Sequence, residues 1–154
     1  QSGGLPLAKR APQRQAYRLV ELKRFAEHLG LALNPQPRYF PVDATPSARL
    51  ITAVAQQDGM AAAMALAGAV LAACWREERD IASDATLAEL LEECDLPAER
   101  LAESRGADTQ TRYDAHTQAA MDAGVFGAPT YVIDGELFWG QDRLDFVARK
   151  LGIV

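Results

Sequence analysis

The sequence predicts an α/β protein whose first 124 residues are mostly helical and whose end is a strand–turn–strand–helix unit. In the first part, apolar residues recur at helical spacing, whereas the β-branched and aromatic run at residues 130–133 indicates a strand. Asp134 and Gly135 follow that run as a pair typical of a tight hairpin turn. With 49% hydrophobic and 24% charged residues in 154, the chain can build a real core.

The helices are delimited by proline and glycine. Proline suits the first helical position and glycine suits a left-handed cap, so the first helix is expected from Pro12 to Leu29, with Gly30 ending it. Four prolines make residues 31–46 a loop. Further helices are expected at residues 47–57, 60–75, 84–94, a short stretch from 97, and 108–124, followed by strands at 130–133 and 136–139 and a last helix at 141–151.

The segment at residues 60–75 is apolar on every side. It is shorter than the roughly 20 residues that a membrane crossing needs, so a buried core helix is the interpretation. Tyr17, Trp75 and Phe126 are expected as core residues or as walls of a pocket.

Charge and cysteine usage exclude several functions. The net charge is −5 and the basic residues are scattered, so no nucleic-acid partner is expected. Cys74 and Cys94 form no Cys-x-x-Cys pair, and neither they nor His28 and His116 have metal-ligand spacing, so no metal site is predicted. Two free thiols fit a reducing compartment, although a disulfide would also form if the fold brought the two Cα atoms together.

The stretch from Gly124 to Arg143 contains the candidate ligand-binding residues. Pro129 precedes a strand, either as an ordinary trans loop proline or as a cis proline that leaves the amide and carbonyl of Ala128 free to pair with an extended peptide. At the start of the last helix, free amides attract a carboxylate while Asp142 can hold an ammonium group, as the γ-glutamyl end of glutathione would require. The alternative is that Asp142 only favours the helix dipole.

Residues 125–130 and 134–144, VFGAPT and DGELFWGQDRL, closely resemble the C-terminal signature of the 2-hydroxychromene-2-carboxylate isomerase family. This family is related to kappa-class glutathione transferases and to DsbA-like disulfide oxidoreductases. The resemblance continues through residues 12–29, 40–43, 48–49 and 75–81. It implies a thioredoxin-like fold with a large helical insertion, in which residues 1–124 are mostly the insertion and residues 125–154 are the C-terminal ββα part.

The resemblance also implies roles for individual residues. Ala128, with Pro129 cis, would hold the cysteinyl part of glutathione by its backbone, and Gln141 and Asp142 would hold the γ-glutamyl end. Arg14 stands where the family often has a lysine near the glycine carboxylate. The family's first strand and its serine-bearing loop have no counterpart in this sequence, so no catalytic residue is expected in it.

The implied activity is a glutathione-dependent cis–trans isomerisation that interconverts 2-hydroxychromene-2-carboxylate and trans-o-hydroxybenzylidenepyruvate during aromatic catabolism. The implied partners are glutathione and a small aromatic carboxylic acid, in a cytoplasmic homodimer without a membrane partner. Gly4 stands where the kappa-class relatives have an asparagine contact, so that contact is lost or replaced, and Asp43 stands where an asparagine is common in the family. Alternatives are a kappa-type transferase, a DsbA-like thiol oxidoreductase, and a non-catalytic remnant that binds glutathione or a partner.

Overall fold

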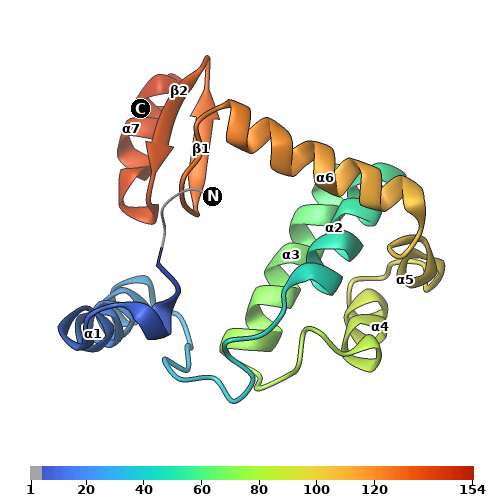
Figure 1. The fold of residues 1–154 in the computed structure, drawn as a ribbon, viewed down its shortest axis with the longest axis horizontal. Helices are drawn as coiled ribbons and strands as arrows, with labels where there is room; N and C mark the ends of the chain where they lie inside the picture. The colour runs from blue at the N-terminus through green and yellow to red at the C-terminus, as the bar shows by residue number, and fades with distance from the viewer. Residues whose placement is uncertain (1–4) are drawn as a thin grey trace. The chain divides into compact units, whose positions relative to one another are not determined.

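The computed structural model describes residues 5–154, which form two compact units. A helical unit comprises residues 11–113, and a second unit comprises residues 5–10 together with 114–154. Figure 1 labels the helices and strands of both units. The division between the units lies inside one long helix, α6, whereas the family-based boundary after residue 124 stays a prediction.

The elements of the helical unit agree with the sequence-based expectation to within a few residues. They are α1 (Pro12–Leu29), α2 (Thr45–Gln57), α3 (Met60–Trp75), α4 (Asp84–Glu93), α5 (Glu99–Glu103) and the first part of α6 (Ala107–Asp122). Gly30 ends α1 with φ 63°, a left-handed conformation that glycine adopts without a side-chain penalty. Helix α2 begins two residues earlier than expected because Pro46 fits its first turn.

The core of the helical unit lies where α2, α3 and α4 meet. Figure 1 shows α2 and α3 side by side, and these two helices share the most extensive packing of the unit. The side chains that point into this core are completely or almost completely buried. The largest of these are Leu50, Val54, Leu66, Leu87, Leu90 and Leu91.

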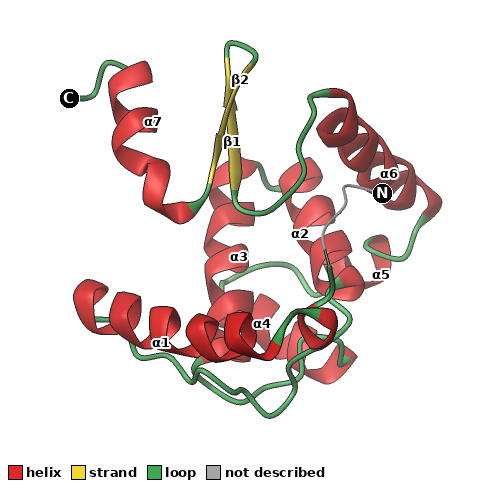
Figure 2. Cartoon of the chain, turned by 60° about the vertical axis from the view of Figure 1, so that its left-hand side comes forward, coloured by secondary structure: helices red, strands yellow, loops and turns green. Residues whose placement is uncertain are grey.

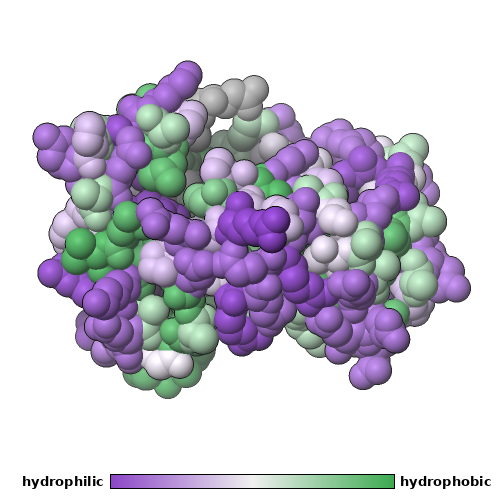
Figure 3. All heavy atoms as spheres, turned by 90° about the horizontal axis from the view of Figure 1, so that it is seen from below, coloured by the Kyte–Doolittle hydropathy of each residue, from purple (hydrophilic) through white to green (hydrophobic). Residues whose placement is uncertain are grey.

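Helix α3 is buried on one face only. Ala63, Leu66 and Val70 point into the core, whereas Met60 and Met64 are 68% and 65% exposed. The core helix expected at residues 60–75 is therefore confirmed on one face, and its other face is exposed. The reason is geometric, because α2 and α4 contact α3 from one side and no sequence pattern distinguishes its two faces. Figure 3 shows apolar side chains gathered in patches among polar ones on one face of the molecule.

No helix among residues 5–154 combines the length and the apolar character that a membrane crossing requires.

Polar contacts join the loops of the helical unit to its core. The amide of Asn34 donates to the carbonyl of Trp75 at 2.7 Å, and the amide of Arg38 donates to the Glu78 carboxylate at 2.7 Å. These bonds hold the proline-rich loop against the end of α3. Arg79, which follows α3 in the chain, forms ion pairs with Glu89 and Glu93 of α4, each at 2.9 Å.

The second unit contains a two-stranded antiparallel sheet. Strand β1 (Thr130–Ile133) pairs with β2 (Glu136–Trp139), with Thr130 opposite Trp139. Asp134 and Gly135 both have positive φ values, 52° and 78°, as the expected hairpin turn requires. Helix α7 (Leu144–Lys150) packs against β1. Figure 2 shows this hairpin in yellow and α7 in red.

The last helix starts later than the sequence indicates. Residues Gln141–Arg143 form a 3-10 turn, η2, and α7 proper begins at Leu144. Gly140 has φ 113°, which only glycine adopts readily, and the amide of Arg143 donates to its carbonyl at 3.3 Å. This tight turn shortens α7 to seven residues. A further short 3-10 turn, η1 (Leu7–Lys9), lies near the start of the chain.

Candidate functional site

The loop before β1 has the backbone geometry that the cis alternative requires. The peptide bond between Ala128 and Pro129 is cis. The Thr130 hydroxyl donates to the carbonyl of Gly127 at 2.5 Å, and the amide of Gly140 donates to the carbonyl of Pro129 at 3.0 Å. The loop is thus joined both to its own strand and to the end of β2.

Ala128 offers an unused pair of backbone groups. Within residues 5–154, neither its N–H nor its C=O has a hydrogen-bond partner, and the residue is exposed. A donor and an acceptor on one residue are what an extended peptide needs in order to pair as an added strand. The site therefore has the backbone features to hold a peptide-like ligand.

Two aromatic rings lie beside this loop. Phe126 and Trp139 pack edge to face with their ring centroids 5.0 Å apart. Gly127 has no room for a side chain, because a Cβ there would lie 2.6 Å from Nε1 of Trp139. Phe126 is 48% exposed, so it is a wall of the site and not a core residue. The position of Trp139 against Gly127 and Phe126 was not predicted from the sequence. Its place beside Gly140 in the motif was a signal that could have indicated it.

The carboxylate of Asp142 is available at the surface. Its Oδ2 accepts a hydrogen bond from Nη1 of Arg143 at 2.8 Å, and both side chains are about half exposed. Such an exposed pair contributes little to stability, so an incoming ammonium group can replace Arg143 at small cost. Gln141 precedes Asp142 in the same turn and is exposed.

Four of the five predicted binding residues thus lie in the second unit, in two neighbouring segments. The bond from Gly140 to Pro129 brings the loop of Ala128 next to the segment of Gln141 and Asp142. Arg14 lies in the first turn of α1, in the helical unit, and is exposed there. Gly4 lies outside the described residues.

The helical unit has an aromatic cluster of its own. Phe40 and Trp75 pack with their ring centroids 4.7 Å apart, and the guanidinium of Arg18 lies 5.4 Å and 5.6 Å from the two rings. Trp75 is therefore a half-buried packing residue. Tyr17 is 58% exposed, so of its two expected roles the core role is wrong and that of a pocket wall stays a prediction.

Neither cysteine has the properties of a reactive thiol. Both are free, and Cys74 is buried while Cys94 is half-buried. Burial raises the pKa of the Cys74 thiol, and burial likewise raises the pKa of the Cys94 thiol, with neighbouring carboxylates adding to both effects. A raised pKa lowers the thiolate fraction at neutral pH, so both thiols are poor nucleophiles. No group of His, Cys, Asp and Glu suited to a metal ion occurs among residues 5–154.

Two relatives of this chain carry the same name. The chain is 32% identical over 144 residues to a 2-hydroxychromene-2-carboxylate isomerase of Pseudomonas sp. (strain C18), covering 88% of this chain and 62% of that protein. It is 33% identical over 140 residues to the Pseudomonas putida protein of the same name, covering 88% of this chain and 64% of that protein. The chain therefore spans somewhat less than two thirds of these relatives.

The fold comparison points the same way. A solved structure of a selenomethionine 2-hydroxychromene-2-carboxylate isomerase superposes with a TM-score of 0.80 at 25% identity, covering 98% of this chain and 71% of that one. This confirms the expected DsbA-like thioredoxin fold, here rich in helix with a small two-stranded sheet. The family model described as a DSBA-like thioredoxin domain matches residues 1–152. The chain belongs to the DSBA-like thioredoxin domain family.

Proposed function

We propose that this chain serves a glutathione-dependent isomerase that interconverts 2-hydroxychromene-2-carboxylate and trans-o-hydroxybenzylidenepyruvate. The names of the relatives support the isomerase class, and the unused backbone groups of Ala128 support a peptide-like cofactor. The exposed carboxylate of Asp142 near the same loop supports a cofactor that carries an ammonium group. The observation that carries the proposal is that these two features lie in segments joined by the hydrogen bond from Gly140 to Pro129.

Residues of this chain hold and orient the cofactor. The N–H and C=O of Ala128 pair with the backbone of the cysteinyl residue, as an added strand would. Asp142 binds the α-ammonium group of the γ-glutamyl end, and Gln141 lies beside it. Arg14 is assigned to the glycine carboxylate by family resemblance alone. When bound, glutathione would supply the thiolate for an isomerisation by addition to the conjugated substrate, bond rotation and elimination.

Binding of glutathione is the first test. Titration calorimetry on the chain measures the dissociation constant of glutathione for the native protein and for Asp142→Asn. An ion pair at an exposed carboxylate contributes about 0.2–1 kcal/mol, so the variant should bind about two- to fivefold more weakly. Asp145→Asn removes an exposed carboxylate three residues further on and is the matched control. An absence of heat with the native chain contradicts the proposal. Equal glutathione affinity of the native protein and Asp142→Asn also contradicts it.

Activity separates this proposal from its neighbours. Ring opening of 2-hydroxychromene-2-carboxylate, followed by absorbance with the full-length protein, is compared with insulin reduction and with conjugation of chlorodinitrobenzene. A thiol–disulfide oxidoreductase is the second candidate, because the matching family model is DSBA-like. Insulin reduction without ring opening favours that candidate. The homodimer and the cytoplasmic location stay predictions.

A further inference from the structure

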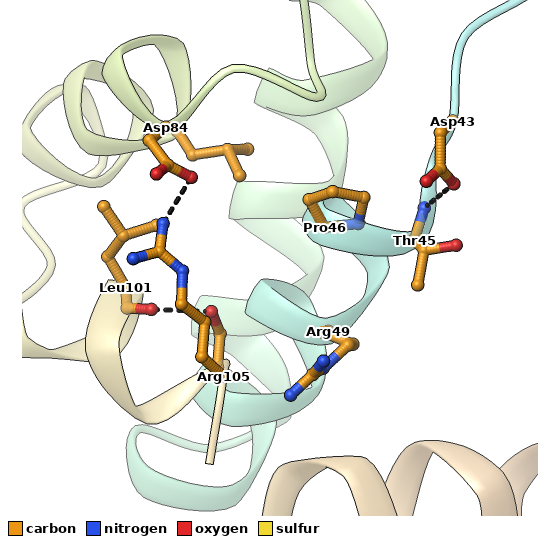
Figure 4. A pocket seen from close by; sticks show the side chains of 9 residues that line it. Asp43, Thr45, Pro46, Arg49, Asp84, Leu101 and Arg105 are labelled. Carbon is orange, nitrogen blue, oxygen red and sulfur yellow. Dashed lines mark hydrogen bonds and ion pairs between the residues drawn. The ribbon is translucent and has the colours of Figure 1, made fainter.

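The helical unit contains a pocket that the proposed glutathione site does not use. Its volume is about 250 Å³. Figure 4 shows side chains from α2, from α4 and from the segment at α5 converging on it. Its apolar part consists of Pro46, Leu87 and Leu101, and Leu87 is fully buried. The polar lining residues are Asp43, Thr45, Arg49, Asp84, Ser104 and Arg105.

Arg49 is the unusual member of this lining. Its Nε is closed off from solvent and has no hydrogen-bond partner among residues 5–154. The guanidinium makes one long bond, from Nη2 to the carbonyl of Gly106 at 3.4 Å, and no ion pair reaches it within the described residues. In Figure 4 no dashed line joins Arg49 to the other residues drawn. Because arginine keeps its charge, a guanidinium whose Nε is buried without a partner is suited to bind an anion.

The other charged side chains of the pocket are already engaged. Arg105 pairs with Asp84, and these side chains are 55% and 64% exposed. Asp43 accepts a hydrogen bond from the amide of Thr45 at 2.9 Å. Hydrogen bonding to Thr45 also keeps the pKa of the Asp43 carboxyl below its ordinary value, so this group is an anion at neutral pH. Arg49 is thus the one lining cation without a carboxylate partner among residues 5–154.

These charges restrict the ligand. A carboxylate matches the planar donors of a guanidinium in two parallel hydrogen bonds. A group with two negative charges is disfavoured, because Asp43 and Asp84 line the same pocket. The apolar surface of Leu87 and Leu101 suits a compact hydrocarbon body.

We propose that this pocket binds a small organic monocarboxylate, with its carboxylate on the Arg49 guanidinium and its apolar body against Leu87 and Leu101. The site shares no residue with the proposed glutathione site. Either proposal can therefore be wrong while the other holds.

The test uses benzoate as the probe, titrated into the full chain by calorimetry. Benzamide has the same shape without the charge, and phthalate and inorganic phosphate carry more than one charge. Benzoate should bind at least about tenfold more tightly than benzamide, because the charge-assisted pair is lost in the amide. Arg49→Gln should weaken benzoate binding by about tenfold or more. Arg112→Gln, an exposed change of the same kind in α6, should leave it unchanged.

Several outcomes overturn the proposal. Equal binding of benzamide and benzoate, tighter binding of phosphate or phthalate, or full retention of benzoate binding by Arg49→Gln would each do so. Loss of benzoate binding in Asp142→Asn, or competition by glutathione, would place the probe in the other site. If Arg49→Gln does not fold, Arg49→Met is the substitute, since replacing an unpaired half-buried charge with an apolar chain of similar length is tolerated.

Discussion

Replacing Gly127 with alanine tests the wall that borders the candidate cofactor site. The new Cβ would lie 2.6 Å from Nε1 and 3.2 Å from Cε2 of Trp139, so the indole ring has to move. Its edge-to-face contact with Phe126 is then lost. Such a contact contributes about 0.5–1.5 kcal/mol, which is the expected decrease in the free energy of unfolding. Urea denaturation measures that decrease, and the indole N–H resonance of Trp139 reports the movement of the ring by NMR.

Gly68→Ala is the matched control, with an effect of opposite sign. Gly68 lies inside α3, its φ is not positive, and an added Cβ meets no atom within 4 Å. Alanine in a helix interior should therefore raise the free energy of unfolding by about 0.5–1 kcal/mol. An unchanged Trp139 resonance and unchanged stability in Gly127→Ala would refute the packing argument. A shifted Trp139 resonance with unaltered glutathione affinity would instead show that the aromatic wall does not contribute to cofactor binding.

Two further predictions concern the helical unit. Leu66 is fully buried in the core, so Leu66→Ala should lower the free energy of unfolding by about 2–5 kcal/mol, measured by chemical denaturation; a cost like that of Met64→Ala on the exposed face would contradict the assigned core. Because the pKa values of Cys74 and Cys94 are raised, iodoacetamide should modify both thiols in the native protein more slowly than in the denatured protein at pH 8. The rate should climb as the pH approaches the raised values, and fast native labelling at neutral pH would contradict the reasoning.

Local signals predicted the secondary structure well. Pro12 and Gly30 delimit α1 at the expected residues, and Asp134-Gly135 forms the hairpin turn between strands whose bounds agree with those expected. These signals act within a few residues, through the fixed φ of proline, the freedom of glycine and the turn preference of an Asp-Gly pair. The resemblance carried by residues 125–144 was likewise enough to predict the fold.

Other features depend on segments that are distant in the sequence. The apolar pattern of α3 is the same on every side, so its exposed face became visible only when α2 and α4 were seen on the other side. Likewise, the sequence did not show that Arg79 has carboxylate partners or that Arg49 lacks one among residues 5–154. Their states follow from carboxylates of α4 that reach one guanidinium and not the other.

The sequence alone therefore determined the order of helices and strands and the hairpin turn. Short-range backbone preferences and a conspicuous motif were sufficient for that. Only the tertiary structure decided that Trp139 borders the loop of Ala128 and that a charged pocket forms between α2, α4 and α5. The physical reason is that burial, ion pairing and close contact depend on which distant segments pack together, and local preference carries no information about that.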